Sequence, residues 1–411
     1  MSDAGFVSQG RYLPDDMAHQ LHVAHLCFAF AAALFALCSG AGIVYTVSAS
    51  FLVRRFFSRP KDAPAGFPAI TIVKPLHGDE WQLLENLTSF VEQDYPGPVQ
   101  HIFGVHDRCD SALAAVEALR ARFPDKSMTV VVDSRVYGPN RKIANLTNML
   151  DLAEHDVLCF ADSDVSVNPG FLRDIAGALQ QPGVGLVTCA YRGLCAPGFW
   201  PRVGSAMSDY HFLPGVVTGL AIGRARPCFG QTIVITKDTL MRTGGLAQFA
   251  HHLAEDYAIG EAVRGIGLQV VVPAFIVRHA CVETTFSQLF AHELRWSRTI
   301  RAADPAGHLG AILMHPFALA SLAALFSFGN PLACGLVALT LVVRAILVWQ
   351  TDRSTDTRCS GFPWLPLWDV LQFVIYVASF FSFRVLWRGR HFNVDEDGLL
   401  SPCVQRDAGL K

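Results

Sequence analysis

Apolar residues gather at the two ends of the chain, and the middle alternates between short apolar runs and amphipathic stretches. No charged residue occurs from Leu26 to Ala49, which is long enough for one bilayer-spanning helix. Apolar stretches recur near Leu309–Gly329, Pro331–Trp349 and Trp364–Phe383. The pattern predicts a chain held in a membrane at both ends, with a separately folded region between.

The charges beside the first apolar stretch predict its orientation. Arg54, Arg55, Arg59 and Lys61 follow it at once, whereas Arg11 is the one fixed positive charge before it. The positive-inside bias then places the N-terminus outside and the region after residue 53 in the cytoplasm. A cleaved signal peptide is the alternative, but the segment lacks a basic n-region and is too long for an h-region. We therefore interpret it as an anchor.

The C-terminal apolar stretches predict a helical hairpin, because Gly329-Asn330-Pro331 between the first two is a turn signal. Arg344 and Asp369 interrupt the second and third stretches, and such charges should face protein or reach the membrane surface. Three crossings would put the arginines of residues 384–390 outside, against the charge bias. We interpret one segment, the last, as re-entrant or interfacial, and the sequence leaves the number of crossings open.

The middle region, from about residue 68 to 280, predicts an α/β domain. Helical stretches such as Trp81–Glu92 and Ser111–Arg122 lie between apolar runs. The predicted strands are Ala69–Val73, His101–Val105, Met128–Val132, Val157–Ala161, Val184–Cys189, Gln231–Thr236 and Leu268–Val272. This alternation favours a Rossmann-like, mainly parallel sheet that binds ligands at the carboxyl ends of its strands. Neither G-x-G-x-x-G nor a Walker A motif is present.

The bulk composition narrows the function further. The 411 residues are 51% hydrophobic and only 17% charged, with a net charge of −2, so no basic field points to nucleic acid. The 11 cysteines are scattered, with no C-x-x-C, and predict no zinc site. They are most simply reduced and buried.

Asp162-Ser163-Asp164, directly after the fourth predicted strand, is the most informative polar cluster. Two carboxylates with one residue between them can hold one divalent cation, and hard oxygen ligands suit Mg²⁺ or Mn²⁺, which in turn suit a diphosphate. Such a pair also occurs in ordinary turns and helix caps. The metal interpretation therefore depends on the other clusters at the same sheet edge.

Those clusters supply the groups that a nucleotide-sugar donor needs. Asp107, after the second strand, can accept a hydrogen bond from a uracil N–H. Lys142 and Arg295 can stabilise a departing diphosphate, and Asp256 can take the acceptor's proton as a general base. These polar residues can also have purely structural roles. Asp107 could cap a helix or turn, Lys142 could be a solvated charge, and Trp296, next to Arg295, could be an aromatic residue at the membrane interface.

With these residues in place, the chain resembles a known family. Residues 68–302 resemble a family 2-type inverting glycosyltransferase domain, nearest to the ceramide glucosyltransferase family, with its three aspartate motifs followed by Q/R-x-x-R-W. Asp107 matches the first motif, Asp162 with Asp164 the second, and Asp256 in AEDYAIGEA the third. Further likeness lies in KPLHGDE, ENLTSFVEQDYP, NRKIANLTNML and GGLAQFAHHLAEDY, and in Trp387-Arg388-Gly389-Arg390.

The resemblance implies a GT-A fold, a UDP-sugar donor, a Mg²⁺ or Mn²⁺ ion and a membrane-lipid acceptor. The implied metal ligands are Asp162 and Asp164. The implied donor-binding residues are Pro75, Asp79, Glu80, Asp107, Lys142 and Asp162. The implied catalytic residues are Asp256, Arg295, Trp296 and His292.

One position departs from the family's pattern, because His292 stands where Q/R-x-x-R-W has Gln or Arg. Its role is open, and its charge can vary near neutral pH. The surrounding stretch Phe286–Arg301 has apolar residues at near-helical spacing. We interpret it as an interfacial helix that brings the site to the bilayer surface, and an ordinary helix packed on the sheet is the alternative.

Within the family, GVGLVTCAYRG, YHFLPGVVTGLAIGRARPCFG and HELRWSRTIRAADPAG most resemble the glycosyltransferases of bacterial hopanoid biosynthesis. That likeness implies transfer of N-acetylglucosamine to a hopanoid such as bacteriohopanetetrol. It also implies a multi-pass protein of the bacterial inner membrane with a cytoplasmic catalytic domain. Transfer of glucose to ceramide remains the alternative.

The predicted organisation has four parts. These are a tail and anchor (1–60), a GT-A domain (61–281), an interfacial helix with H-x-x-R-W (282–308) and a C-terminal transmembrane or re-entrant region (309–411).

Three other functions compete with this interpretation. A processive polysaccharide synthase would need a longer membrane channel and Gln at position 292. A non-catalytic membrane binding or scaffold protein would be expected to lack one or more of the aspartates, and none is missing. A phosphodiester hydrolase could use Asp162 and Asp164 but explains neither Asp256 nor the Arg-Trp pair.

Overall fold

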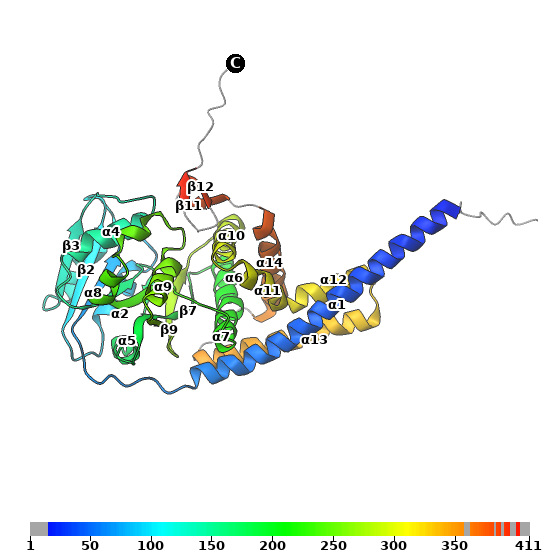
Figure 1. Cartoon of the computed structure of the whole chain (residues 1–411), viewed down its shortest axis with the longest axis horizontal. Coiled ribbons are helices and arrows are strands. Elements are labelled where there is room, and N and C mark those ends of the chain that lie inside the picture. The colour runs from blue at the N-terminus through cyan, green and yellow to red at the C-terminus, as the bar shows by residue number, and fades with distance from the viewer. Residues whose placement is uncertain (1–14, 357–361, 382–383, 388–389, 395–399, 403–411) are drawn as a thin grey trace, which may run out of the picture.

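The computed structural model describes residues 15–356, 362–381, 384–387, 390–394 and 400–402. It joins an α/β domain to a group of long apolar helices (Figure 1). Between them lie the helices α6 (Phe199–Met207), α10 (Phe286–Ala303) and α14 (Leu365–Ala378). Arg388 and Gly389 of the C-terminal family motif, and Arg11 before the anchor, lie outside the described residues.

The α/β domain is built on a seven-stranded sheet of order β3-β2-β1-β4-β8-β6-β9. Every strand of this sheet was predicted, to within two residues at each end, and the α/β fold with a mainly parallel sheet is confirmed. The strands are β1 (Ile70–Pro75), β2 (Val99–Val105), β3 (Ser127–Val132), β4 (Val157–Ala161), β6 (Val184–Thr188), β8 (Thr232–Thr236) and β9 (Gln269–Val271).

One strand of this sheet runs against the others, and this shapes the site. β8 is antiparallel to both β4 and β6, whereas the β1–β2, β1–β4, β2–β3 and β6–β9 pairs are parallel. Ala161 at the end of β4 therefore pairs with Thr232 at the start of β8. Residues that precede β8 thus lie at the same edge as residues that follow β4.

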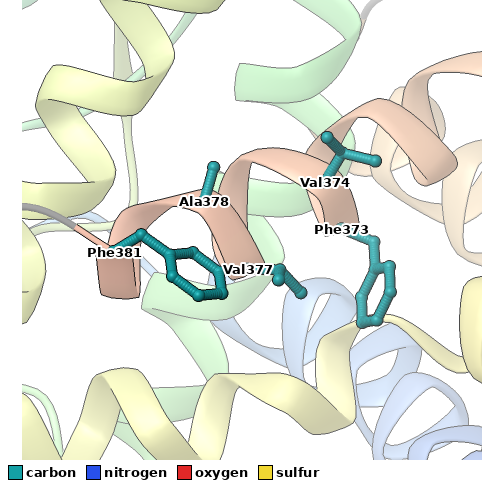
Figure 2. A pocket seen from close by; sticks show the side chains of 5 residues that line it. All are labelled: Phe373, Val374, Val377, Ala378 and Phe381. Atoms are coloured by element: carbon teal, nitrogen blue, oxygen red, sulfur yellow. The ribbon is translucent and has the colours of Figure 1, made fainter.

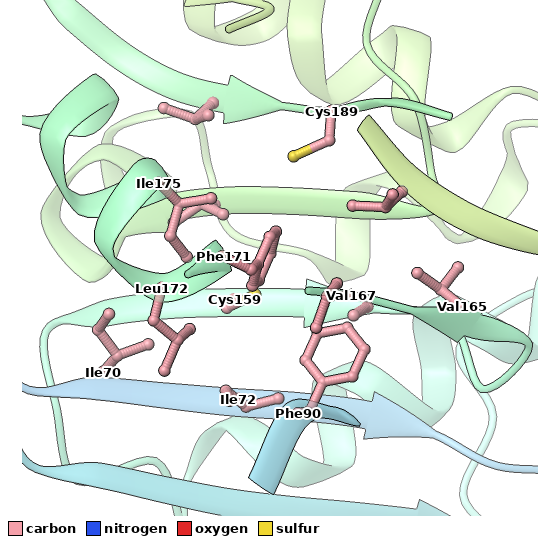
Figure 3. Close-up of a cluster of buried hydrophobic side chains, with 14 of the residues drawn as sticks. Ile70, Ile72, Phe90, Cys159, Val165, Val167, Phe171, Leu172, Ile175 and Cys189 are labelled. Atoms are coloured by element: carbon pink, nitrogen blue, oxygen red, sulfur yellow. The ribbon is translucent and has the colours of Figure 1, made fainter. Parts of the chain in front are cut away.

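The two faces of the sheet bury separate cores, because successive strand residues point to opposite faces. In β4, Cys159 belongs to one core, while Leu158 and Phe160 belong to the other. Figure 3 shows the first core, where Phe90 of α2 and Phe171 of α5 pack over the strands. The domain helices are α2 (Leu83–Val91), α3 (Ala112–Arg122), α4 (Arg141–Leu150), α5 (Phe171–Leu179), α8 (Lys237–Arg242) and α9 (Glu255–Gly265).

A second sheet was missed by the sequence reading. It orders β5 (Val165–Ser166), β10 (Ile276–Cys281) and β7 (Ala190–Cys195). Arginine, glycine and histidine interrupt β7 and β10, so neither shows the apolar run that marked the other strands. The Asp162–Asp164 turn connects the two sheets, because it lies between β4 and β5.

The membrane part contains three helices that are long and apolar enough to cross a bilayer within the described residues: His19–Phe57, Pro331–Thr355 and Phe362–Phe381. The first is most of α1 (Asp15–Phe57), the second is α13, and the third contains α14 (Leu365–Ala378). α1 packs along both α12 (Pro316–Phe326) and α13. The predicted apolar segments at both ends are thus confirmed as apolar helices.

The stretch Leu309–Gly329 is not one straight helix. The predicted hairpin of two straight helices is therefore corrected in its first arm. Helical residues Pro305–Met314 and α12 meet at an angle of 66°. The bend falls at Pro316, whose missing N–H and bulky ring prevent a helix from running through unbroken. The predicted turn at residues 329–331 does occur: Gly329 has φ +77°, and the Asn330 side chain caps α13.

α1 fits closely into this bend. A Cβ at Gly42 would lie 2.8 Å from the carbonyl oxygen of Leu313 and 3.1 Å from the Cβ of Pro316, so only glycine fits here without movement. Ser39 donates a hydrogen bond to the carbonyl of Pro316 at 2.9 Å. The carbonyl at the bend thus has a partner inside the bundle.

The two charges in the apolar helices face protein, as expected. Arg344 of α13 and Asp369 of α14 are each only 2% exposed, and they pair through two hydrogen bonds of 2.7 Å.

An apolar pocket of about 300 Å³ lies on another face of α14, lined by Phe373, Val374, Val377, Ala378 and Phe381 (Figure 2).

Close packing of α5 against the segment after α1 gives a stability prediction. A Cβ at Gly177 would overlap the backbone carbonyl of Asp62, which cannot rotate away. We expect Gly177→Ala to lower the thermal unfolding midpoint, since overpacking of this kind typically costs about 1–3 kcal/mol. Gly170→Ala on the same helix is the control, because the nearest atom to its Cβ is 3.7 Å away. Equal midpoints for the two variants would contradict the close contact.

Candidate active site

A lysine joins two of the predicted aspartates at the sheet edge. Lys142 Nζ lies 2.7 Å from Asp162 Oδ1 and 3.4 Å from Glu255 Oε1, and it donates to the carbonyl of Gly230 at 3.0 Å. The N–H of Gly230 in turn donates to Asp256 Oδ2 at 2.8 Å. The antiparallel β8 makes this possible, since Gly230 precedes that strand and Asp162 follows β4. Residues far apart in the sequence thus form one network.

Helix termini hold the members of this network in place. Asn140 caps α4 by accepting from the N–H of Ile143, and its side-chain nitrogen donates to Glu255 at 3.0 Å. Glu255 and Asp256 occupy the first turn of α9, where the helix dipole favours negative charge. Asp256 Oδ1 also accepts the N–H of Tyr257 at 2.8 Å. The starts of α4 and α9 therefore set the position of Asp256 relative to Lys142.

Burial and crowding of negative charge shift the pKa values of these carboxyls. Burial raises the pKa of Asp256 to about 6, helped by Glu255 and opposed by Lys142 and two backbone hydrogen bonds. Burial likewise raises the pKa of Asp162, which Lys142 opposes. The pKa of Lys142 is raised, because the attraction of Asp162 and Glu255 outweighs its burial. Asp256 is thus a carboxyl that accepts a proton near neutral pH.

Asp164 faces a histidine that the sequence reading missed. His279 Nδ1 lies 3.4 Å from Asp164 Oδ2, and the N–H of Ala280 donates to the Asp164 carbonyl at 3.0 Å. Burial alone would raise the pKa of Asp164, yet the pKa is lowered because His279 and the nearby lysines favour the carboxylate. A lone histidine in a strand that was itself unrecognised gave no signal in the sequence.

Lys74, in the polar stretch KPLHGDE at the end of the first strand, was assigned no role from the sequence. It is fully buried in β1, donates to the carbonyl of Asp162 at 2.8 Å, and lies 3.6 Å from the centroid of the Phe90 ring. Burial lowers its pKa to about 7. Glu80, predicted as donor-binding, faces the same turn: burial raises its pKa to about 7, opposed by a hydrogen bond with Ser163. Both residues therefore act on the Asp162–Asp164 turn from β1 and the segment that follows it.

The other predicted donor-binding residues lie outside the Lys142 network. Asp107 follows β2, two strands from β4; it is exposed, and its Oδ1 accepts the N–H of Cys109 at 2.9 Å. Pro75 ends β1 and is half-buried, and Asp79 is exposed. All three lie at the carboxyl edge of the sheet, and their roles in donor binding remain predictions.

The H-x-x-R-W residues lie on α10 (Phe286–Ala303), which starts with a capping box between Thr285 and Gln288. The ring of Trp296 lies 4.6 Å from that of His292, 5.7 Å from His279 and 5.9 Å from Tyr191, centroid to centroid. His292 Nδ1 also hydrogen-bonds to Glu283. Trp296 thereby links the predicted motif to the histidine beside Asp164.

The other predicted residue of this motif, Arg295, is half-buried on the same helix. Burial lowers its pKa, and the carboxylates of Glu255, Glu283 and Glu293 oppose that shift. Its guanidinium therefore stays positively charged, as an arginine does at any ordinary pH.

The donor set at the turn suits a hard divalent cation. Asp164 Oδ1 and Glu80 Oε2 are buried acceptors without a hydrogen-bond partner, next to the carboxylate of Asp162. No group of three or more His, Cys, Asp or Glu side chains is arranged to hold a metal within the described part of the chain. Mg²⁺ is commonly held by one or two carboxylates together with substrate phosphates and water, and this arrangement fits that pattern.

Comparison with known protein families identifies the family of this chain. The model of the family named Glycosyl transferase family 21 matches residues 32–400, so the chain belongs to this family. Among curated proteins it is similar to ceramide glucosyltransferase 1 of Caenorhabditis elegans, at 21% identity over 268 residues, which cover 64% of this chain and 56% of that protein. The ceramide glucosyltransferase of Candida albicans is 29% identical over 120 residues, or 26% of this chain and 22% of that protein. The matched region thus spans little more than half of the worm relative.

Solved structures show a looser likeness. The mannosyltransferase PcManGT from Pyrobaculum calidifontis, in complex with GDP-Man and Mn²⁺, aligns with a TM-score of 0.49 and 19% identity, covering 86% of this chain and 99% of that one. Staphylococcus aureus TarS in complex with UDP-GlcNAc aligns with a TM-score of 0.38 and 14% identity, covering 81% and 98%.

Proposed function

We propose that this family 21 protein is an inverting glycosyltransferase that moves a sugar from a UDP-sugar to the hydroxyl of a membrane lipid. The network around Lys142 carries the proposal, because it brings Asp162 and Asp256 to one edge of the sheet. Asp162 is suited to bind the diphosphate end of the donor through a cation, and Asp256 is suited to remove the proton from the acceptor hydroxyl. A single displacement needs one base, and it inverts the sugar's stereochemistry.

In this mechanism Asp256 removes the proton from the acceptor hydroxyl as the sugar is transferred. Two backbone N–H groups hold its carboxylate, and its raised pKa makes it a better base than an exposed aspartate. Lys142 and Arg295 stabilise negative charge on the leaving diphosphate. Asp162 and Asp164 would hold a divalent cation, with His279 positioned to orient Asp164. When bound there, such an ion would neutralise charge on the diphosphate as a Lewis acid.

The membrane helices support a lipid acceptor. Transferring a lipid chain into water costs about 0.8 kcal/mol per CH₂, so the enzyme must reach the headgroup while the hydrocarbon stays in the bilayer. α10, which carries Arg295 and Trp296, packs against α14, and Gln372 of α14 donates to Glu293 of α10 at 3.1 Å. An element of the catalytic site is therefore in direct contact with a candidate membrane span.

For the specific substrates we propose UDP-N-acetylglucosamine and a hopanoid such as bacteriohopanetetrol, at the cytoplasmic face of a bacterial inner membrane. The sequence likeness given above supports this choice. UDP-glucose and ceramide are the alternative, which the likeness to ceramide glucosyltransferases supports. The two donors differ by one acetamido group.

Mass spectrometry of lipids from cells that express or lack this chain tests the proposal. A glycosylated lipid that depends on expression is expected, and its mass distinguishes N-acetylhexosamine from hexose and a hopanoid from ceramide. Titration of the purified protein with UDP provides the second test. No lipid product and no UDP binding would indicate a non-catalytic scaffold instead.

The pKa of Asp256 predicts how the rate depends on pH. A general base acts in its deprotonated form, so with a pKa of about 6 we expect kcat/KM to be level above about pH 7. It should fall about tenfold per pH unit well below pH 6. Glu255→Gln removes a negative neighbour that raises this pKa, and should move the inflection to lower pH. A level profile down to pH 4.5 would exclude Asp256 as the titrating base.

A further inference from the structure

The helix that connects the membrane part with the active site contains an unusual turn. α6 (Phe199–Met207), the π-helical turn Ser208–Phe212 and α7 (Leu213–Ala221) follow one another without a break. Such wide turns are rare and occur mostly at functional sites. This one has the membrane helices on one side and the catalytic domain on the other.

Pro214 explains why the turn takes a partner from outside its own helix. Proline has no N–H, so it cannot donate to the carbonyl of Tyr210, four residues earlier. Arg344 of α13 donates to that carbonyl instead, with Nη1 at 3.0 Å. The same guanidinium makes the two hydrogen bonds to Asp369 of α14. A gap in the hydrogen bonding of one helix is thus closed by a charge from another.

The next residue of the turn binds the other end of the ion pair. His211 Nε2 lies 2.8 Å from Asp369 Oδ1, and its ring stacks on that of His315 at 5.5 Å. His211 is 4% exposed, so water does not compete for these contacts. Arg344 and Asp369 together therefore hold both the backbone and a side chain of the turn.

Phe212, the residue after His211, contacts residues of the α/β domain near the proposed active site. Phe212 stacks on Tyr191 at 4.7 Å and meets Phe229 edge-on at 5.5 Å. Tyr191 in turn contacts the rings of Trp296 and His279. Phe229 directly precedes Gly230, whose backbone binds both Lys142 and Asp256. An unbroken set of contacts thus leads from the ion pair to the proposed base.

We propose that Arg344 and Asp369 are positioning residues of the transferase site. By fixing the turn at Tyr210 and His211 they hold Phe212 against Tyr191 and Phe229. These rings support Trp296 on α10 and the Gly230 backbone that orients Asp256. The inference rests on the proposed function, and it adds two membrane residues that touch neither donor nor acceptor.

The positioning role of the Arg344–Asp369 pair depends on its directional hydrogen bonds. A buried ion pair can often be exchanged for apolar residues of similar volume without loss of stability, whereas removing one partner alone is strongly destabilising. Only the charged pair, however, can satisfy the Tyr210 carbonyl and His211 at once. This separates a positioning role from a purely stabilising one.

The double variant Arg344→Met with Asp369→Leu, in lipid nanodiscs, tests the role. We expect the unfolding midpoint to stay within a few degrees of wild type and the Kd for UDP to stay within about twofold, whereas kcat falls about tenfold. Thr340→Val is the matched control, because Thr340 is a buried polar residue of α13 that bonds only to Val337 of its own helix; its kcat should not change. An unchanged kcat in the folded double variant would overturn the proposal. No lipid glycosylation by wild type would instead refute the proposed function.

Two further variants test the connection itself. Phe212→Leu and His211→Asn leave the ion pair in place, and each should lower kcat about as much as the double variant does. Adding Phe212→Leu to the double variant should cause no further loss, because both changes break the same set of contacts. Losses that multiply, or normal kcat in both single variants, would show that the turn does not carry the effect.

Discussion

Replacing Asp256 with asparagine is expected to reduce sugar transfer by about 10²–10⁴-fold, the usual contribution of a positioned general base. Asparagine keeps the size of the side chain, but its single oxygen can accept only one of the two N–H groups, because Gly230 donates to Oδ2 and Tyr257 donates to Oδ1. It cannot accept the acceptor's proton. Donor binding should change less than turnover, because the hydrogen bonds that link Asp256 to Lys142 run through the backbone of Gly230. Steady-state kinetics together with UDP-sugar titration measure the two effects separately.

Glu255→Gln is the matched control for this experiment. Glu255 is the adjacent carboxylate in the same first turn of α9, and it also contacts Lys142. If negative charge near Lys142 were what matters, both variants would lose activity together. Turnover that survives in Asp256→Asn would remove Asp256 as the base and leave the mechanism without one.

The second large effect is expected at the Asp162–Asp164 turn. Asp162→Asn and Asp164→Asn should each weaken UDP-sugar binding in the presence of Mn²⁺ and lower activity by at least about 10²-fold, because a bound cation contributes several kcal/mol of charge stabilisation. The two buried acceptors without partners, Asp164 Oδ1 and Glu80 Oε2, are the structural reason to expect a cation here. EDTA should abolish wild-type activity, and added Mg²⁺ or Mn²⁺ should restore it.

Asp174→Asn provides the control for these variants. Asp174 is a carboxylate of α5 that pairs with Lys61, away from the Asp162–Asp164 turn, and its loss should leave metal dependence unchanged. Full activity in EDTA would exclude the metal assignment. Lys142 and Arg295 would then be the positive charges that remain to stabilise the diphosphate.

Much of the fold was predictable because buried parallel strands appear as apolar runs. The antiparallel β8 and the partly exposed edge strands β3 and β9 also appear as apolar runs. The reversed direction of β8 was not visible, since a strand's residues look the same in either direction. That reversal places Gly230 beside Asp162. Because of this reversal, motifs that are far apart in the sequence lie together at one site.

The site was predicted less completely than the fold. His279 lies inside a strand, where a single polar residue is usually a tolerated exception rather than a ligand. Lys74 stands in the polar stretch KPLHGDE, and the sequence does not show that its side chain is buried against the Asp162 carbonyl. The bend at Pro316 was missed because an apolar stretch shows its length but not its angle. The clusters after strand ends were recognised because parallel strands bring them to one edge.

The fit of α1 around Gly42 has a consequence for how the protein can be rebuilt. An apolar helix of equal length taken from another protein would keep the chain in the bilayer but would carry a side chain where Gly42 admits none. The bent segment, and α14 packed against α12 beyond it, would have to shift. Anchor exchange in this protein should therefore impair the proposed sugar transfer even when insertion into the membrane is complete.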